Sequence, residues 1–296
     1  MAELDATVCD AESLEAMITG GDSYTATQLY VGQIRRLQAA DDYLEAEAFG
    51  ARGVSALVAE GEVANATNIA LKVVESMTTR KAAIDEKAYA RLIGMVEAYG
   101  VTGCPAPPAQ VRTQKLAMLR AACKLAASSA PLQATYAREL AADGQLAAAA
   151  RVFASADAPA EYAMLLKRWA AEGYAGESDL FTARAVLHLL ATGRAEQAGT
   201  LYEALGAPDA TPLEHFLGHV LELLRLTRSY RVGSEGGRLA FDALIRSYSK
   251  ALTRDQNVMK LAQAAGARLF RWEPPQTPMQ SMMKNMMKMF EDPQAP

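Results

Sequence analysis

A short signature occurs three times between Asp22 and Ala66, and it decides the fold. The copies are Asp22-Ser23-Tyr24-Thr25-Ala26, Asp42-Tyr43-Leu44-Glu45-Ala46 and Gly61-Glu62-Val63-Ala64-Asn65-Ala66. Each copy places a Gly or Asp before an apolar residue and then an Ala, and the copies recur at roughly 20 residues, which is one helix plus a turn. Small Ala residues just after a turn let two helices approach closely. The signature therefore predicts stacked pairs of helices.

The same signature returns in the second half of the chain, at Gly144-Gln145-Leu146-Ala147-Ala148-Ala149 and at Gly193-Arg194-Ala195-Glu196-Gln197-Ala198. Few stretches alternate apolar and polar residues with β-branched side chains, so no convincing sheet is expected. We predict an all-α fold, an α-solenoid of stacked TPR-like antiparallel helix pairs. Such chains usually form binding surfaces and perform no chemistry.

Composition and charge narrow the class of protein. The chain has 296 residues, 51% of them hydrophobic, and a net charge of -4. This balance disfavours a nucleic-acid binder, which would need a basic face. The three cysteines are scattered and odd in number, which indicates free thiols in a reducing, cytosolic compartment. Neither a signal peptide nor an apolar run of about 18 residues is visible, so no direct membrane insertion is expected.

Helical periodicity divides the chain into three parts. We expect a disordered N-terminus over residues 1–10, a single α-solenoid over 11–276, and a Met-rich amphipathic tail over 277–296. Ser178-Asp179 is interpreted as an N-terminal helix cap and Ser229 to Gly237 as a turn-rich interruption. The expected helices span residues 11–19, 24–39, 43–60, 63–79, 85–99, 109–125, 131–142, 146–156, 159–171, 178–191, 195–205, 212–226, 238–251 and 253–269.

Catalytic and metal-binding motifs are scarce. The chain has no phosphate-binding loop, no dinucleotide fingerprint and no Gly-x-Ser-x-Gly elbow. His215 and His219 stand four residues apart on one expected helix with Glu222 one turn further, but no third ligand is indicated. A polar helix face is the favoured interpretation of these histidines. We therefore expect no enzymatic activity, no cofactor and no metal.

Two other features have competing interpretations. Arg35 and Arg36 stand near a helix end, where they could contact a partner or simply complement the helix dipole, and the sequence alone favours the dipole. The tail from Met279 to Phe290 has methionines on one side and could bind apolar segments. The favoured alternative is that this helix folds back onto the solenoid or onto a partner.

The order and spacing of several stretches resemble the Golgi to ER traffic protein 4 family, which serves the guided-entry pathway for tail-anchored membrane proteins. The resemblance runs from about Tyr24 to Phe290. Its quoted stretches are Tyr24-Thr25-Ala26 through Arg36, Glu45-Ala46, Gly53, Gly61, Val73-Val74-Glu75-Ser76, Met164-Leu165 through Gly173, Asp179 through Leu187, Pro212-Leu213 to Phe216-Leu217, Leu269-Phe270 and Pro274-Pro275-Gln276-Thr277.

The resemblance implies a non-enzymatic cytosolic adaptor with two binding faces. The N-terminal half, residues 11–128, would dock on the targeting ATPase, with Arg36 as a matching basic contact beside Arg35. The family's acidic contact aligns with Asn68, so the contact there is expected to be weaker or to use another residue, such as Glu75 on the same helix. The C-terminal half, residues 129–276, would bind a ubiquitin-like adaptor that recruits co-chaperones. In animals this half also engages a large ubiquitin-like scaffold.

We assign an apolar stripe to the adaptor-binding face. A helix left bare at this point would expose more apolar area than a monomer usually tolerates, so we expect a permanent partner there. Its members are Leu213, Phe216, Leu217, Val220, Leu224, Leu239, Phe241 and Leu244. Two rival functions remain: a generic TPR-like scaffold that binds peptides in a groove, and a direct binder of apolar segments through the Met-rich tail.

Overall fold

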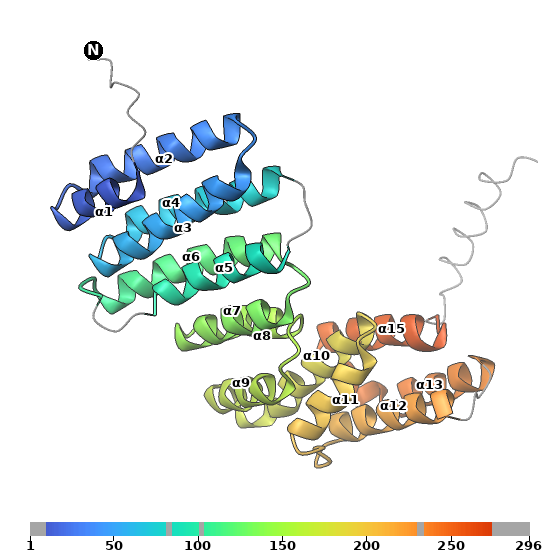
Figure 1. Ribbon diagram of the computed structural model, residues 1–296. Coiled ribbons are helices and arrows are strands. Elements are labelled where there is room, and N and C mark those ends of the chain that lie inside the picture. The colour runs from blue at the N-terminus through green and yellow to red at the C-terminus, as the bar shows by residue number, and fades with distance from the viewer. Residues whose placement is uncertain (1–9, 81–84, 101–103, 230–233, 274–296) are drawn as a thin grey trace, which may run out of the picture. The chain divides into compact units, whose positions relative to one another are not determined.

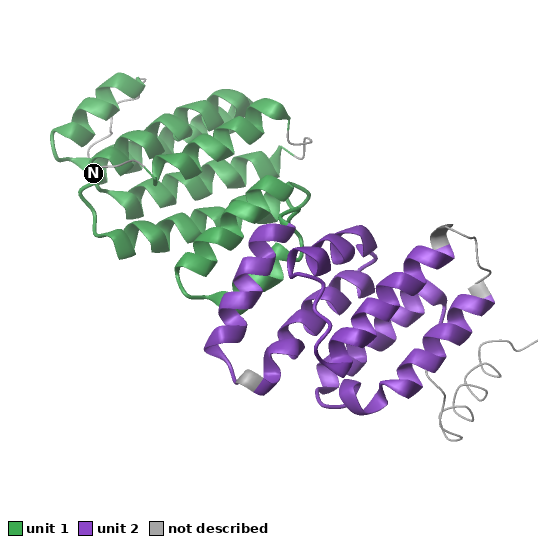
Figure 2. Ribbon diagram, turned by 90° about the horizontal axis from the view of Figure 1, so that it is seen from below, with its two compact units in different colours: residues 1–158 green, residues 159–296 purple. Residues whose placement is uncertain are grey.

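The computed structural model describes residues 10–80, 85–100, 104–229 and 234–273. These residues form α-helices α1 to α15 with one short 3-10 helix, and the described ranges contain no strand, which confirms the all-α prediction. The chain divides into two compact units, residues 1–158 and 159–296 (Figure 2). The sequence placed its functional division at 128/129 instead, inside the first unit. One continuous solenoid over 11–276 stays a prediction.

Unit 1 is built from antiparallel pairs of helices stacked side by side (Figure 1). Helices α1, α3 and α5 form one layer, and α2, α4 and α6 form the other. The bounds agree with the sequence to within two residues at most ends. They are α1 Ala11–Thr19, α2 Ser23–Ala39, α3 Tyr43–Ala59, α4 Val63–Thr79, α5 Glu86–Ala98, α6 Pro108–Leu125, α7 Ala130–Ala142 and α8 Leu146–Phe153.

The repeated signature explains the close packing of unit 1. Ala26, Ala46 and Ala66, the last residue of each copy, are completely buried. Glycines in α3 bring the helices closer still, since a Cβ atom on Gly53 would lie 2.8 Å from the ring of Tyr30. The turns before α2 and α3 are set by Asp22 and Asp42, whose carboxylates cap the helices.

Unit 2 is organised around α10, whose neighbours are α9, α11, α12 and α15. Most of α10 is buried, in keeping with this central position. The bounds are α9 Pro159–Glu172, the 3-10 helix Ala175–Glu177, α10 Ser178–Ala191, α11 Ala195–Ala204, α12 Pro212–Ser229, α13 Ser234–Ser247, α14 Ser249–Leu252 and α15 Gln256–Phe270.

Two local predictions in unit 2 were wrong. Helix α13 begins at Ser234 and so includes Gly236 and Gly237, where the sequence predicts a turn. A Cβ atom on Gly237 would lie 3.1 Å from Thr227 and 3.3 Å from Phe270, so this glycine permits close packing within a helix. The N-cap of α10 is Glu177, without a capping hydrogen bond from its side chain. The Met-rich tail and Cys9 lie outside the described residues.

Candidate functional site

The predicted ATPase face lies on the outer side of α2 and α4, which pack against each other in unit 1. Arg35 and Arg36 are both exposed near the end of α2. Nη1 of Arg36 donates a weak hydrogen bond to Oε1 of Gln33 at 3.4 Å. Neither arginine forms an ion pair within the part of the chain that the structure describes. Both guanidinium groups are therefore available to a partner.

Helix α4 supplies the other half of this surface. Asn68 and Glu75 are exposed, and Leu71 between them is 41% exposed. Nζ of Lys72 lies 2.7 Å from Oε2 of Glu75, whose side chain is 63% exposed. An ion pair this exposed contributes little to stability, so Glu75 can exchange it for a partner's cation at small cost. The face thus carries an acidic group and a polar amide beside an apolar side chain.

The side chains of this face occupy comparable positions along the two helices. Helices α2 and α4 both have 17 residues and begin at Ser23 and Val63. Arg35 and Glu75 therefore occupy the same position in their helices, and Arg36 is one residue further. We call the exposed surface formed by Arg35, Arg36, Asn68, Leu71 and Glu75 the α2/α4 face.

The opposite layer of unit 1 has an open groove of about 670 Å³ along α3. Its floor consists of small residues, among them Ala48, Ser55 and Ala59. Nη2 of Arg52 and Oε1 of Glu15 form an ion pair of 3.0 Å across one wall. The groove contains charges of both signs, so its lining selects no particular charge in a ligand.

A buried carboxylate anchors the helices below this groove. The side chain of Glu47 in α3 is fully buried, and its Oε2 atom accepts a hydrogen bond of 2.7 Å from Nη1 of Arg91. Nε of Arg80 lies 3.5 Å from the other carboxylate oxygen. Desolvation on burial raises the pKa of Glu47, although both arginines oppose the shift. The cluster ties α3 to α5 and to the end of α4, and so has a structural role.

The predicted adaptor face in unit 2 is contradicted as a surface. The structure buries six of its eight side chains within the unit: Leu213, Phe216, Leu217, Val220, Leu224 and Phe241. Their apolar stripe is covered by other elements of the same unit, so no partner is needed to cover it. Leu239 is 54% exposed and Leu244 is half-buried, so these two alone remain on the surface.

Aromatic packing shows what covers the stripe. Phe216 and Phe241 have ring centroids 6.4 Å apart, and Tyr248 lies 5.8 Å from Phe216. Trp272, two residues after the end of α15, packs edge-on against Phe241, with ring centroids 5.6 Å apart. Its indole Nε1 donates a hydrogen bond of 3.0 Å to Asp242. Residues distant in sequence therefore complete this core.

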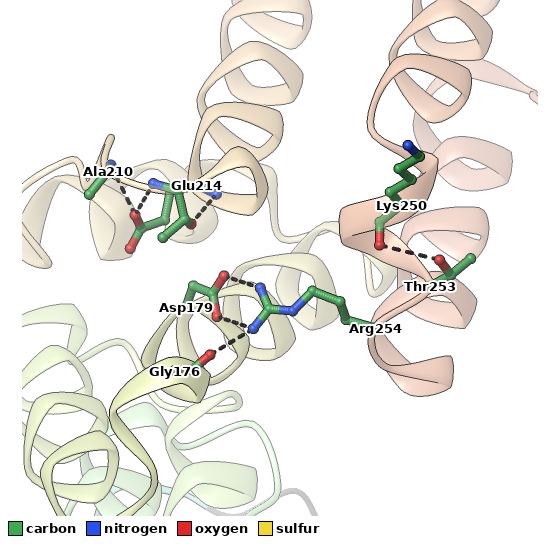
Figure 3. A network of polar contacts seen from close by, with 8 residues as sticks. Gly176, Asp179, Ala210, Glu214, Lys250, Thr253 and Arg254 are labelled. Carbon is green, nitrogen blue, oxygen red and sulfur yellow. Dashed lines mark hydrogen bonds and ion pairs between the residues drawn. The ribbon is translucent and has the colours of Figure 1, made fainter.

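A polar network ties the ends of α10 and α15 together (Figure 3). Asp179 is buried and accepts hydrogen bonds of 2.6 and 3.3 Å from Arg254, which also donates to the carbonyl oxygen of Gly176. Nη2 of Arg184 lies 2.6 Å from Oδ2 of Asp255. In the first pair the acidic residue lies on α10, whereas in the second pair the basic residue does. A shift of α10 along α15 would bring like charges together, so the two pairs fix how these helices are aligned. Asp179 therefore serves as an ion-pair partner where the sequence suggested a cap.

A capping box at the start of α12 was missed. Oε2 of Glu214 accepts hydrogen bonds from the backbone N–H groups of Ala210 and Thr211 (Figure 3), and Thr211 accepts one from the N–H of Glu214. The signal was available in Thr211-Pro212-Leu213-Glu214, which has the spacing of such a box. The box fixes where α12 begins.

The histidines of α12 do not converge on one point. Nε2 of His215 lies 3.0 Å from Oδ1 of Asp209, whereas His219 packs 6.1 Å from the ring of Tyr248. No cluster of three ligating side chains occurs within the described ranges. Among the same residues, none of the helices combines the length and apolar character that a bilayer crossing requires.

Comparison with known proteins identifies the family. The family described as Golgi to ER traffic protein 4 matches residues 40–290. The chain belongs to this family. A Golgi to ER traffic protein 4 homolog from Oryzias latipes is 29% identical over 125 residues, which cover 39% of this chain and 36% of that protein. The alignment therefore spans little more than a third of the relative's length.

A crystal structure of Get4 from C. therm. is similar in fold. It has a TM-score of 0.73 and 17% identity, and the match covers 93% of this chain and 94% of that one. The match shows that this chain shares the fold of that protein. Membership supports a role in traffic to the endoplasmic reticulum.

Proposed function

We propose that the chain is a non-enzymatic cytosolic adaptor that targets tail-anchored membrane proteins to the endoplasmic reticulum. In this proposal the α2/α4 face of unit 1 binds the targeting ATPase, and unit 2 binds a ubiquitin-like adaptor. In animals the second partner can be a large ubiquitin-like scaffold. Family membership supports the pathway, and the exposed surfaces of the two units support the division of labour.

One observation carries the ATPase assignment. Arg36 is exposed without an ion-pair partner in the described residues, and it lies one position beyond the level of Glu75 on the neighbouring helix. If Arg36 only complemented the dipole of α2, an acidic residue such as Glu75 on the neighbouring helix would have no part in that role. A surface with separate basic and acidic groups favours a partner with the complementary pattern.

The test is charge reversal at Arg36. Arg36→Glu should weaken ATPase binding about ten-fold in titration calorimetry at low salt, because an attractive contact becomes a repulsive one. Lys87→Glu changes the net charge equally on the exposed part of α5 and should leave affinity unchanged. Equal affinities for both variants would refute the assignment.

Asn68 offers the opposite test. Asn68→Asp restores the acidic group that the family carries at the aligned position, and this exposed site accepts a carboxylate without burial. The substitution should strengthen ATPase binding, and the gain should shrink as salt rises. Weaker binding would show that the alignment at Asn68 is wrong.

Adaptor binding is proposed for the surface of unit 2 around Leu239 rather than for the buried stripe. Leu239→Asp should reduce co-purification with the ubiquitin-like adaptor without changing the thermal midpoint, because the side chain is half in solvent. ATPase binding should persist. Retention of the adaptor by this variant would move the contact to another part of unit 2.

The two rival functions are separated by further variants. The groove along α3 favours a peptide-binding scaffold, and Ala51→Trp would fill its floor and block a peptide there. Deletion of residues 279–296 tests direct binding of apolar segments. The adaptor proposal expects ATPase binding to survive both changes, whereas each rival expects the loss of its own ligand.

A further inference from the structure

Charge is segregated between the two layers of unit 1. Helices α2, α4 and α6 contain eight charged side chains, of which seven are basic. Helices α1, α3 and α5 contain nine, of which six are acidic. The whole chain is acidic, with a net charge of -4. A basic layer on an acidic protein is therefore a localised feature and does not follow from the composition.

The basic layer extends beyond the α2/α4 face onto α6. Arg112, Arg120 and Lys124 are exposed on α6, which packs against α4. We call these three side chains the α6 row. The turns before α4 and α6 are at the same level, since a Cβ atom on Gly61 would lie 2.7 Å from Pro105. Arg120 consequently holds the same helix position as Arg35 and Glu75.

Intramolecular roles account for only part of the α6 row, since Lys124 lies in the last turn of α6, where the helix dipole favours a cation. Lys115 on the same helix is already paired with Glu139 at 2.8 Å. Nε of Arg120 donates only to the hydroxyl of Tyr136, at 3.3 Å. Arg112 lies in the second turn of α6, near the end where the helix dipole disfavours a cation. Arg112 and Lys124 form no ion pair in the described ranges.

The position of Glu75 distinguishes between classes of partner. This exposed carboxylate lies on α4, between the cations of α2 and those of α6. The centre of the face carries the Lys72–Glu75 ion pair, so it offers no net positive charge to a uniformly anionic surface such as a bilayer rich in acidic lipids. A folded protein can instead place carboxylates opposite the two outer helices and a cation opposite Glu75.

We propose that the α6 row is a second contact row of the ATPase-docking face, and that its partner surface has two acidic patches flanking a basic one. This inference rests on the proposed function, because it takes the targeting ATPase as the occupant. The two rows make the docking face three helices wide. The α6 row selects an acidic patch that Arg35 and Arg36 do not reach.

The test compares two variants of the full chain, each with the charge of two cations reversed. Arg112→Glu with Lys124→Glu should weaken binding of the targeting ATPase about ten-fold at 50 mM salt. The loss should fall to about two-fold at 500 mM salt, where screening is stronger. Lys87→Glu with Arg151→Glu is the matched control, because these exposed cations lie on α5 and α8. Thermal melts establish that each variant is folded.

A conservative change separates docking from internal structure. Arg120→Lys keeps the positive charge but changes the contact with Tyr136, so ATPase affinity should stay within about two-fold of the original if charge is what matters. A larger loss in this variant, at an unchanged thermal midpoint, would show that the guanidinium geometry carries the contact and would overturn the charge argument.

The outcomes distinguish this inference from the function on which it rests. If Arg36→Glu weakens binding while the α6 reversal equals its control, the second row is refuted and the ATPase proposal stands. If the unchanged chain does not bind the ATPase, the proposed function fails and the inference fails with it. If the α6 reversal instead abolishes binding to phosphatidylserine vesicles and leaves ATPase affinity intact, the partner is a membrane surface and the inference is overturned.

Discussion

Truncating Phe216 tests whether the apolar stripe of α12 is core or interface. The side chain is completely buried and contacts the rings of Phe241 and Tyr248. Replacing a buried Phe by Ala removes its transfer free energy and leaves a cavity, which costs about 3–5 kcal/mol. For a unit of this size each kcal/mol lowers the midpoint by about 3–4 °C, so Phe216→Ala should lower the melting temperature of unit 2 by about 10–20 °C.

Leu239→Ala is the matched control for this measurement. Leu239 belongs to the same predicted stripe but is 54% exposed, so its truncation should cost no more than about 0.5 kcal/mol. Thermal unfolding followed by circular dichroism gives the midpoints, and hydrogen exchange shows which unit opens. A Phe216→Ala protein that melts within about 2 °C of the original, with the isolated chain becoming less prone to aggregate, would refute the core assignment.

Two further predictions concern stability. Burial raises the pKa of Glu47, so the folded state binds the proton of this carboxyl group more tightly than the unfolded state does. The free energy of unfolding of the original protein, relative to that of Glu47→Gln, should therefore fall as pH rises above about 4.5. Urea unfolding from pH 4 to 7 measures this difference. The reverse trend would mean that Arg80 and Arg91 outweigh desolvation. Gly266→Ala should destabilise unit 2 by about 2 kcal/mol or more, because the new Cβ would lie 2.2 Å from buried Phe241. Gly199→Ala, in open space on α11, should instead stabilise the unit by up to about 1 kcal/mol. Equal melting temperatures for these two variants would contradict this account of the packing.

The helices of unit 1 were predictable because local signals agree with the tertiary structure. The spacing of Val63, Ala66 and Ala70 marks the buried side of α4, and all three side chains are completely buried. Gly61 supplies the positive φ of 83° at the preceding turn. Where a glycine serves packing instead, the same reasoning fails. Gly237 was interpreted as a turn residue for this reason, although it lies within α13.

The candidate sites were predictable only in part. The sequence places Arg36 near a helix end, and the structure finds it exposed in the last turn of α2. Its role in ATPase binding stays a prediction. The fate of the apolar stripe could not be inferred locally, because Trp272 and Tyr248 lie far from Phe216 in sequence and cover it only in the folded unit. The α6 row was missed because the sequence does not show that α6 packs beside α4, which places its cations next to the α2/α4 face.

The separation of charge between the two layers gives unit 1 an electric dipole perpendicular to its layers. In the field of an acidic surface, a molecule with such a dipole experiences a torque while it is still in solution, and it rotates until α2, α4 and α6 face that surface. Collisions then begin from a restricted set of orientations. Charge reversals that left every contact intact but reduced the difference in charge between the layers would slow productive encounter without changing how long a formed complex lasts.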